Sequence, residues 1–250
     1  QLEMSLDLVT IRCDVPLDPG LDSVGTSEPD TEELRELFGA LDFQSLVQRV
    51  MEGKRPELPR DYVTVRDEGE LDAMIAELGE ARCFAVDTET TSLFPLEAEL
   101  VGVSFSAGGG RAFYVPFNLE PPVLAGGRAA LLERLAPLLC DPSLLRIGQN
   151  YKYDALVFLA NGLRVPPADF DTMVASFCAA GSTRRHNLDD LALRFFDLHK
   201  IPTKQIIGTG KKQVTMDQVA VDTVAEYACE DADVTFRLRE VMQRELAENH

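Results

Sequence analysis

The stretch Cys83-Phe84-Ala85-Val86-Asp87-Thr88-Glu89 begins as an apolar run and ends with two carboxylates. The apolar run is too short for a helix, so it predicts a buried strand. Strand alternation places Asp87 and Glu89 on the same side, with their carboxylates about 6–7 Å apart along the backbone. That spacing allows both groups to share one divalent ion, and burying carboxylates without a compensating cation is costly. The alternative interpretation is a solvated strand end, where acids are common.

The residues around this run predict an α/β fold. Apolar segments predict four further strands, and Gly108-Gly109-Gly110 predicts a hairpin between two of them. The strands are expected at about 62–65, 100–105, 111–115 and 144–148, and the helices at about 67–78, 128–139, 150–161, 171–180, 188–197, 216–220 and 222–247. Three consecutive strands followed by strand–helix alternation indicate a mixed five-stranded sheet flanked by helices.

Residues 1–60 have a different character from the rest of the chain. They carry 13 acidic and 6 basic side chains and no long periodic pattern. Their features are an alternating segment at 6–11 that predicts a strand remnant, a loop-like composition at 14–29, a capped short helix from about 30, and a second break at 54–59. We therefore expect a mostly irregular or helical N-terminal extension over 1–60 and a main domain over 61–250.

The overall composition limits the class of protein. The 42 acidic and 24 basic residues give a formal net charge of −18, which disfavours holding nucleic acid by bulk charge. The five cysteines include no CxxC pair, which argues against a zinc knuckle or a disulfide framework and favours a reducing compartment. No apolar run approaches the roughly 18 residues of a membrane span, and no signal peptide opens the sequence. We expect a soluble cytoplasmic protein that does not bind membranes.

Two further acidic positions strengthen the metal hypothesis. Asp154 lies about one turn into the helix that begins at Asn150, directly after a predicted strand. In the C-terminal helix, Tyr227 and Asp231 are spaced i and i+4 and therefore share one face. Their neighbours Glu230 and Asp233 point in other directions, and we expect them to be solvated. The alternative for Tyr227 and Asp231 is a surface hydrogen bond or core packing.

Three stretches of the sequence resemble the motifs of a known enzyme family. Residues 84–93, 148–154 and 227–235 are similar, in order and spacing, to the three exonuclease motifs of the DEDDy superfamily. The closest likeness is the 3′→5′ proofreading domain of bacterial DNA polymerase I, over about residues 61–247. The resemblance implies an RNase H-like fold. Residues 6–15 and the region of about 30–50 also resemble the end of that polymerase's 5′-nuclease domain and the linker after it, which implies a fragment lacking the polymerase domain.

The resemblance implies a site for two divalent ions. By similarity, Asp87, Glu89 and Asp231 hold the ion that generates hydroxide, Asp87 bridges to the second ion, and Asp154 acts on that ion through ordered water. Oxygen ligands favour Mg²⁺ or Mn²⁺, with Zn²⁺ possible at one position. Tyr227 is expected to orient the attacking water, because a phenol with an ordinary pKa near 10 is a weak general base.

The substrate contacts follow from the same resemblance. Leu93 would wedge against the terminal base, Thr88 would make backbone contacts to the terminal nucleotide, and Asn150 and Tyr153 would hold the single strand. The alternative for Leu93 is ordinary core packing. Some members of the family carry an aromatic residue in the stretch where this sequence has Thr203 and Lys204. This difference leaves open how the terminal base would be held.

A local basic segment contrasts with the acidic whole. Residues 182–213 contain seven Lys or Arg and three Asp, and they include Arg185 and Lys211. The Gly-rich part at 208–212 lacks the frame of a P-loop. We interpret the segment as a phosphate track for single-stranded DNA, although such charge runs are often simply solvated surfaces.

The expected function is hydrolysis of DNA from the 3′ end, releasing nucleoside 5′-monophosphates as in proofreading. The partners would be the single-stranded 3′ end and the missing polymerase domain, and the chain would be a monomer in a bacterial cytoplasm. One alternative is an RNA-trimming exonuclease similar to ribonuclease D, which shares the same metal chemistry. The other is a catalytically inactive scaffold.

Overall fold

A computed structural model describes residues 2–11, 25, 29–41, 43–51 and 59–249 of the chain. The chain divides into two units, Gln1–Lys54 and Arg55–His250. In the described residues of the first unit there are three helices, and the second unit contains the sheet. The predicted loop at 14–29 and the predicted break at 54–59 lie almost wholly outside the described residues.

The first unit corrects one prediction. The alternating segment 6–11 does not form a strand remnant, because residues Leu2–Val9 form helix α1 and every one of them is exposed. A strand needs a neighbouring strand for its backbone hydrogen bonds, whereas a helix satisfies its own. The predicted cap is confirmed in α2 (Thr31–Ala40), where the Asp30 side chain accepts hydrogen bonds from the amides of Glu32 and Glu33. A third helix, α3, spans Gln44–Met51.

The second unit is built on a mixed six-stranded sheet with the order β1-β4-β3-β2-β5-β6. Its strands are β1 (Asp61–Thr64), β2 (Cys83–Thr90), β3 (Leu100–Gly108), β4 (Arg111–Pro116), β5 (Leu145–Gly148) and β6 (Phe170–Asp171). Strands β2, β3 and β4 pair antiparallel, and the other pairs are parallel. All five predicted strands are confirmed. The prediction of only five is wrong, because β6 has two residues and is too short to leave a pattern.

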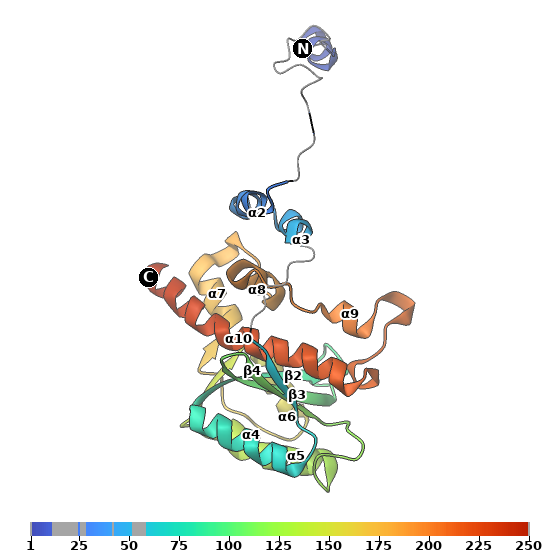
Figure 1. The fold of residues 1–250 in the computed structure, drawn as a ribbon, viewed down its shortest axis with the longest axis vertical. Coiled ribbons are helices and arrows are strands. Elements are labelled where there is room, and N and C mark those ends of the chain that lie inside the picture. Colours follow the sequence, from blue (N-terminus) through green and yellow to red (C-terminus); the bar gives the residue numbers. More distant parts are fainter. Residues whose placement is uncertain (1, 12–24, 26–28, 42, 52–58, 250) are drawn as a thin grey trace. The chain divides into compact units, whose positions relative to one another are not determined.

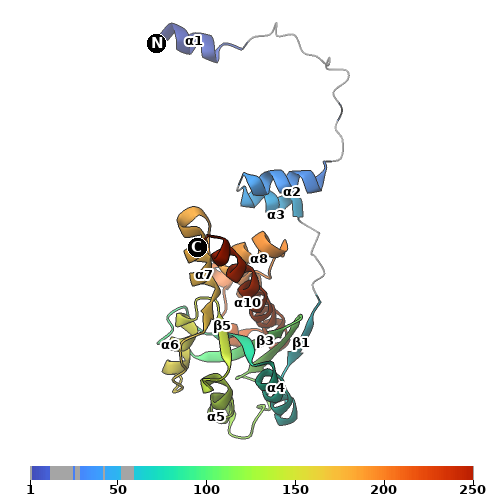
Figure 2. The ribbon, with the colours of Figure 1, turned by 90° about the vertical axis from the view of Figure 1, so that its left-hand side faces the viewer.

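One face of the sheet packs against a large apolar core. Helices α4 (Glu68–Ala81) and α5 (Gly127–Cys140) cover this face, as Figure 1 shows. Helix α6 (Lys152–Ala160) lies beside β5 (Figure 2) and contributes Val157 and Phe158 to the same core. Alternate residues of β2 and β3, including Phe84 and Phe105, point into it. This face supplies the apolar burial that holds the sheet.

The other face carries the long helix α10 (Val221–Asn249), which crosses the strands (Figure 1). Val224 and Ala228 of α10 pack with Ala112 and Tyr114 of β4. On β3 this face presents small residues, and a Cβ at Gly102 would lie 2.1 Å from the Tyr114 hydroxyl oxygen. The small side chain therefore makes room for Tyr114, and α10 can lie close to the end of β2 that carries Asp87 and Glu89.

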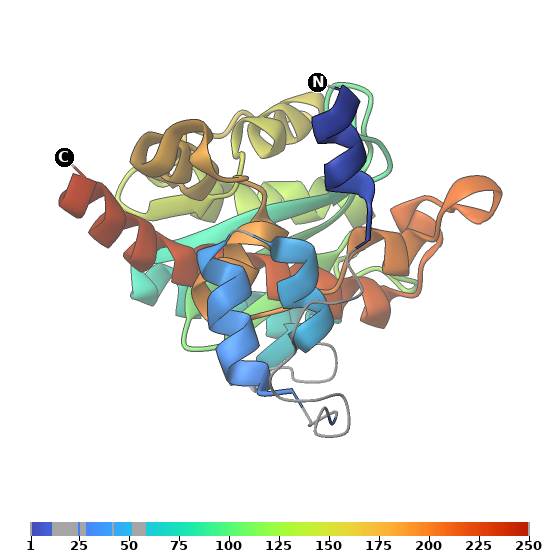
Figure 3. The same ribbon diagram turned by 90° about the horizontal axis from the view of Figure 1, so that it is seen from above.

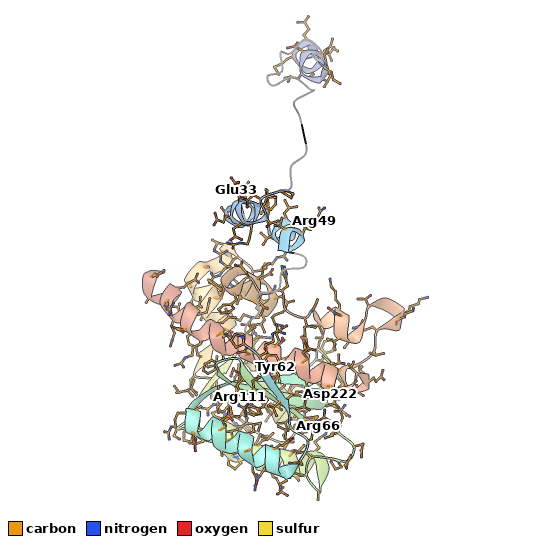
Figure 4. All side chains as sticks on the ribbon, viewed as in Figure 1. Glu33, Arg49, Tyr62, Arg66, Arg111 and Asp222 are labelled. Carbon is orange, nitrogen blue, oxygen red and sulfur yellow. The ribbon has the colours of Figure 1, made fainter. Side chains whose placement is uncertain are left out.

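Ion pairs connect β1 and its neighbours to this frame. Figure 4 shows Arg66, just after β1, next to Asp222 at the start of α10, and the two form a salt bridge. Arg111, also labelled there, begins β4 and pairs with Asp61 of β1. The first of these exposed pairs joins the segment after the edge strand β1 to α10, and the second joins β1 to β4; each contributes little stability alone.

The remaining elements surround α10. They are α7 (Thr172–Ala180), α8 (Leu188–Phe196), α9 (Thr203–Ile207) and the 3₁₀ turns Gly181–Thr183, Gly210–Lys212 and Met216–Gln218. The predicted helix at 216–220 is only the last of these turns, and α9 was not predicted. The segment 203–213 projects outward from the sheet (Figure 1 and Figure 3). Across the described residues, no helix is both long and apolar enough to span a membrane.

Two glycines give a test of the packing under α10. Gly102→Ala should destabilise the protein by about 1–3 kcal/mol, because the added methyl group overlaps the Tyr114 side chain. Gly79→Ala in α4 should be neutral or stabilising by up to about 1 kcal/mol, since nothing lies near its Cβ. Denaturant unfolding of both variants measures the difference. Equal stability of the two variants would contradict the close approach at Gly102.

Candidate active site

Asp87 and Glu89 lie on the α10 side of β2, where the sheet register pairs them with Ser104 and Gly102. Glu89 is buried and Asp87 is partly buried. Within the described residues, neither carboxylate takes part in a hydrogen bond or a salt bridge. Two acids thus stand side by side on the strand without a direct partner.

The electrostatics of these two groups show a shortage of positive charge. Burial raises the pKa of Asp87 well above its ordinary value, and the negative charges of Asp154, Glu89 and Asp231 raise it further. Burial likewise raises the pKa of Glu89, with Asp231 and Asp154 adding to the shift. Lys200 opposes the shift at both groups. The four predicted carboxylates therefore lie close enough to repel one another.

Asp154 is held in place by the strand that carries the other two acids. It lies in the first turn of α6 and is only 2% exposed. Its Oδ1 accepts hydrogen bonds from the Thr88 amide at 3.0 Å and the Thr88 hydroxyl at 2.6 Å. Burial raises the pKa of Asp154 to about 7, although both bonds from Thr88 lower it. In this structure the amide and hydroxyl of Thr88 are thus directed at Asp154.

The turn before α6 explains how Asp154 reaches this position. Asn150 has a left-handed backbone, with φ of 60°. The amides of Asn150 and Tyr151 donate to the two oxygens of Asp171, at 3.1 and 2.8 Å. Asp171, at the end of β6, also caps α7. The short sixth strand therefore fixes the start of the helix that presents Asp154.

Asp231, on α10, is paired with a residue that the sequence did not identify as part of the site. Its Oδ1 forms a salt bridge with Nζ of Lys200, whose side chain is only 1% exposed. The same ammonium lies 3.4 Å from Oδ1 of Asp189. Burial raises the pKa of Asp231 to about 6, and Lys200 limits the rise. The sequence signalled Lys200 only as one of several cations in the basic segment.

Tyr227 lies one turn before Asp231 on α10, as the i, i+4 spacing predicts. Its hydroxyl oxygen shares a hydrogen bond with Oγ1 of Thr203, 2.8 Å away. Nζ of Lys200 lies 5.2 Å from the centre of its ring. Burial raises the pKa of Tyr227, and the nearby Asp231 raises it further, so the phenol keeps its proton at neutral pH.

The prediction that Glu230 and Asp233 are solvated is wrong, because both are buried under β1 and the loop after α8. Glu230 accepts hydrogen bonds from Nη2 of Arg60 at 2.7 Å and from the amide of Ile201 at 2.6 Å. Asp233 accepts one from the Tyr62 hydroxyl at 3.2 Å. These three partners lie far away in the sequence, so helix geometry alone could not identify them, whereas Nε of Arg237, which donates to Asp233 at 2.9 Å, has the i, i+4 spacing of the helix. Glu230 fixes the loop that carries Lys200.

The predicted substrate residue Leu93 lies in the exposed loop after β2, and the predicted substrate residue Tyr153, on α6, contacts that loop. Leu93 is 90% exposed, which rules out the alternative of core packing. Phe94 and Leu96 beside it are also exposed. The Tyr153 hydroxyl donates to the carbonyl oxygen of Ser92 at 2.5 Å. Tyr153 therefore anchors the loop that presents these apolar side chains.

The other predicted substrate residues are not drawn into the carboxylate cluster. Asn150 is partly buried and accepts a hydrogen bond from Nζ of Lys152 at 2.5 Å. The Arg185 side chain is 82% exposed and lies 4.0 Å from Asp190. Lys211 is exposed on the projecting segment.

The carboxylates lie together, yet they do not form a ready set of metal ligands. Among the residues that the structure describes, no three His, Cys, Asp or Glu side chains are placed to hold one ion. Asp231 is engaged by Lys200, and Asp154 by Thr88. Metal binding would therefore require these side chains to move.

Comparisons with known proteins agree with this fold. A family model described as 3′-5′ exonuclease matches residues 62–247. DNA polymerase I of Pseudomonas aeruginosa is 38% identical, over 98% of this chain and 29% of its own length. The chain thus spans less than a third of that relative.

Two solved structures show the same fold at low sequence identity. Escherichia coli RNase D, described as an exoribonuclease involved in structured RNA processing, has a TM-score of 0.56 and 16% identity, covering 75% of this chain and 46% of that one. Brucella melitensis NrnC with bound Mg²⁺ has a TM-score of 0.55 and 24% identity, covering 76% and 83%. They confirm the predicted RNase H-like α/β class. The family model and the Pseudomonas relative show that the chain belongs to the 3′–5′ exonuclease family of DNA polymerase I.

Proposed function

We propose that this chain removes nucleotides from the 3′ end of single-stranded or frayed DNA and releases nucleoside 5′-monophosphates. The observation that carries the proposal is the cluster of Asp87, Glu89, Asp154 and Asp231, four carboxylates that are buried together with too little positive charge. Such a cluster is unfavourable by itself and becomes favourable when cations enter it. Proofreading in a DNA polymerase I is the corresponding biological role.

The donor set fits divalent ions that prefer oxygen. We propose that Asp87, Glu89 and Asp231 hold one ion, and that Asp87 also holds a second, on which Asp154 acts through water. Mg²⁺ or Mn²⁺ suits an all-carboxylate set, and Zn²⁺ at one position is compatible with it. When bound, two such ions supply a nucleophilic hydroxide and stabilise the leaving 3′-oxygen.

The protein's own groups then position water and substrate. The protonated hydroxyl of Tyr227, oriented by Thr203, would hold the attacking water. Leu93, supported by the loop that Tyr153 anchors, would separate the terminal base from its neighbour. Apolar and stacking contacts of this kind require no particular base sequence. Thr88 would contact the terminal nucleotide, Asn150 and Tyr153 would help hold the single strand, and Arg185 and Lys211 would contact the phosphates further along.

The proposal also assigns the two parts of the chain and the partner of the exonuclease domain. Residues 1–60 would be the linker and the end of a 5′-nuclease domain, and residues 61–250 the exonuclease. The polymerase domain of the relatives would be a partner of this chain, which would work as a monomer in the bacterial cytoplasm. An RNA-trimming role and an inactive scaffold are the alternatives. The Pseudomonas relative supports DNA as substrate, and the presence of all four carboxylates supports catalysis.

A digestion assay tests the proposed activity. The chain should shorten a 5′-labelled single-stranded DNA from its 3′ end with Mn²⁺, and EDTA should stop the reaction. Asp87→Ala should lower the rate by 1000-fold or more, on the order of 4 kcal/mol of barrier. Asp72→Asn is the control and should keep the wild-type rate, because Asp72 is an exposed acid on α4 that pairs with Arg134 of α5. A faster reaction on matched RNA would favour the RNA-trimming alternative, and no digestion in any condition would favour the scaffold.

The role of Tyr227 can be separated from metal binding. Tyr227→Phe deletes only the hydroxyl, so single-turnover digestion should slow by about 10- to 1000-fold while Mn²⁺ affinity stays near wild type. Tyr62→Phe is the matched control, because it removes the hydroxyl of a partly buried tyrosine, the one hydrogen-bonded to Asp233, without changing the carboxylate cluster. If Tyr227→Phe cleaves as fast as wild type, the tyrosine does not orient the water.

The raised pKa values predict how stability depends on pH in the absence of metal. Asp154 and Asp231 have folded pKa values of about 7 and 6, above the ordinary 3.8, so the folded state binds more protons than the unfolded state. With EDTA present, the free energy of unfolding should therefore fall as pH rises from about 4 to 7, by up to about 1.4 kcal/mol per pH unit for each group. Asp154→Asn should make this decrease in the free energy of unfolding smaller, and added Mn²⁺ should also make it smaller. Stability that rises over this range in EDTA would contradict the shifts.

A further inference from the structure

Lys200 places a buried positive charge at the edge of the carboxylate cluster. It lies in the loop between α8 and α9, and its side chain is only 1% exposed. Its ammonium contacts two acids with different surroundings. Asp231 belongs to the cluster and is nearly buried, whereas the side chain of Asp189, in the first turn of α8, is 63% exposed.

The loop that carries Lys200 is held by a hydrogen bond at the residue that follows it. The amide of Ile201 donates to Oε2 of Glu230 at 2.6 Å, and Glu230 is itself paired with Arg60. Nζ of Lys200 lies over the ring of Tyr227, 5.2 Å from its centre. Because the backbone is fixed there, the rotatable bonds of the lysine side chain are the part that can adjust.

We propose that Lys200 is an internal counter-cation that releases Asp231 to a divalent ion and then stays paired with Asp189. This proposal rests on the metal site proposed above. In the metal-free protein its charge partly neutralises the acids. When an ion arrives, Asp231 turns to it and the ammonium keeps a partner, so no buried charge is left alone. The exchange accounts for an Asp231 that acts electrostatically on Asp87 and Glu89 yet is paired with Lys200, in a set of described residues where no three acids are placed to hold one ion.

The proposal gives two substitutions opposite effects on metal affinity. Lys200→Met keeps the apolar stem and removes the competing charge, so Mn²⁺ should bind more tightly. Asp189→Asn removes the second partner of the ammonium, so releasing Asp231 becomes harder and Mn²⁺ should bind more weakly. A residue that merely supports the fold would weaken binding in both cases. Lys200 is thus a positioning residue that acts through Asp231.

Calorimetric titration of the full chain with Mn²⁺ alone, without DNA, tests the proposal. The dissociation constant should fall at least tenfold for Lys200→Met and rise severalfold for Asp189→Asn. Asp190→Asn is the matched control, because it removes the same charge from the next residue, which does not contact Lys200, and its effect should be smaller than that of Asp189→Asn. Circular dichroism checks that each variant is folded.

The outcomes separate the two proposals. If the wild-type chain binds no Mn²⁺, the proposed metal site itself fails. If the wild type binds Mn²⁺ and Lys200→Met binds it equally or more weakly, the counter-cation proposal is overturned. If Lys200→Met does not fold, the test depends on Asp189→Asn. A Mn²⁺ affinity of Asp189→Asn equal to that of Asp190→Asn overturns the proposal, and a clearly weaker Mn²⁺ affinity supports it.

Discussion

The burial of four carboxylates between one strand and two helices is the constraint on which the rest of this structure depends. Like charges at close range repel, and burial increases the penalty because the surrounding medium screens them poorly. The raised pKa values of Asp87 and Glu89 express that penalty directly. A fold that keeps such a cluster needs strong support elsewhere and a source of positive charge within reach.

The two faces of the sheet divide these tasks. The face under α4 and α5 is an apolar core that includes Phe84, Phe105 and Leu135, and it supplies the burial that stabilises the domain. The face under α10 has small residues such as Gly102 and carries the acids of β2. Because successive residues of a strand alternate between faces, one short strand, β2, contributes Phe84 and Val86 to the core and Asp87 and Glu89 to the site.

Much of this arrangement could be predicted from the sequence, and the reasons for the failures are physical. The apolar run before Asp87 identified β2, and the i, i+4 spacing put Tyr227 and Asp231 on one face. The burial of Glu230 could not be predicted, because its partner Arg60 lies 170 residues away. Lys200 was missed as part of the site for the same reason: only the folded chain shows which acid a loop lysine contacts.

The central claim is that the four carboxylates form a site for two divalent ions, and anomalous X-ray diffraction tests it most directly. Crystals of the chain soaked in Mn²⁺ with a nucleoside 5′-monophosphate should show two anomalous peaks roughly 3.5–4 Å apart. One peak should contact Asp87, Glu89 and Asp231, and the other should contact Asp87. Well-occupied peaks elsewhere on the surface, with none at these carboxylates, would contradict the account.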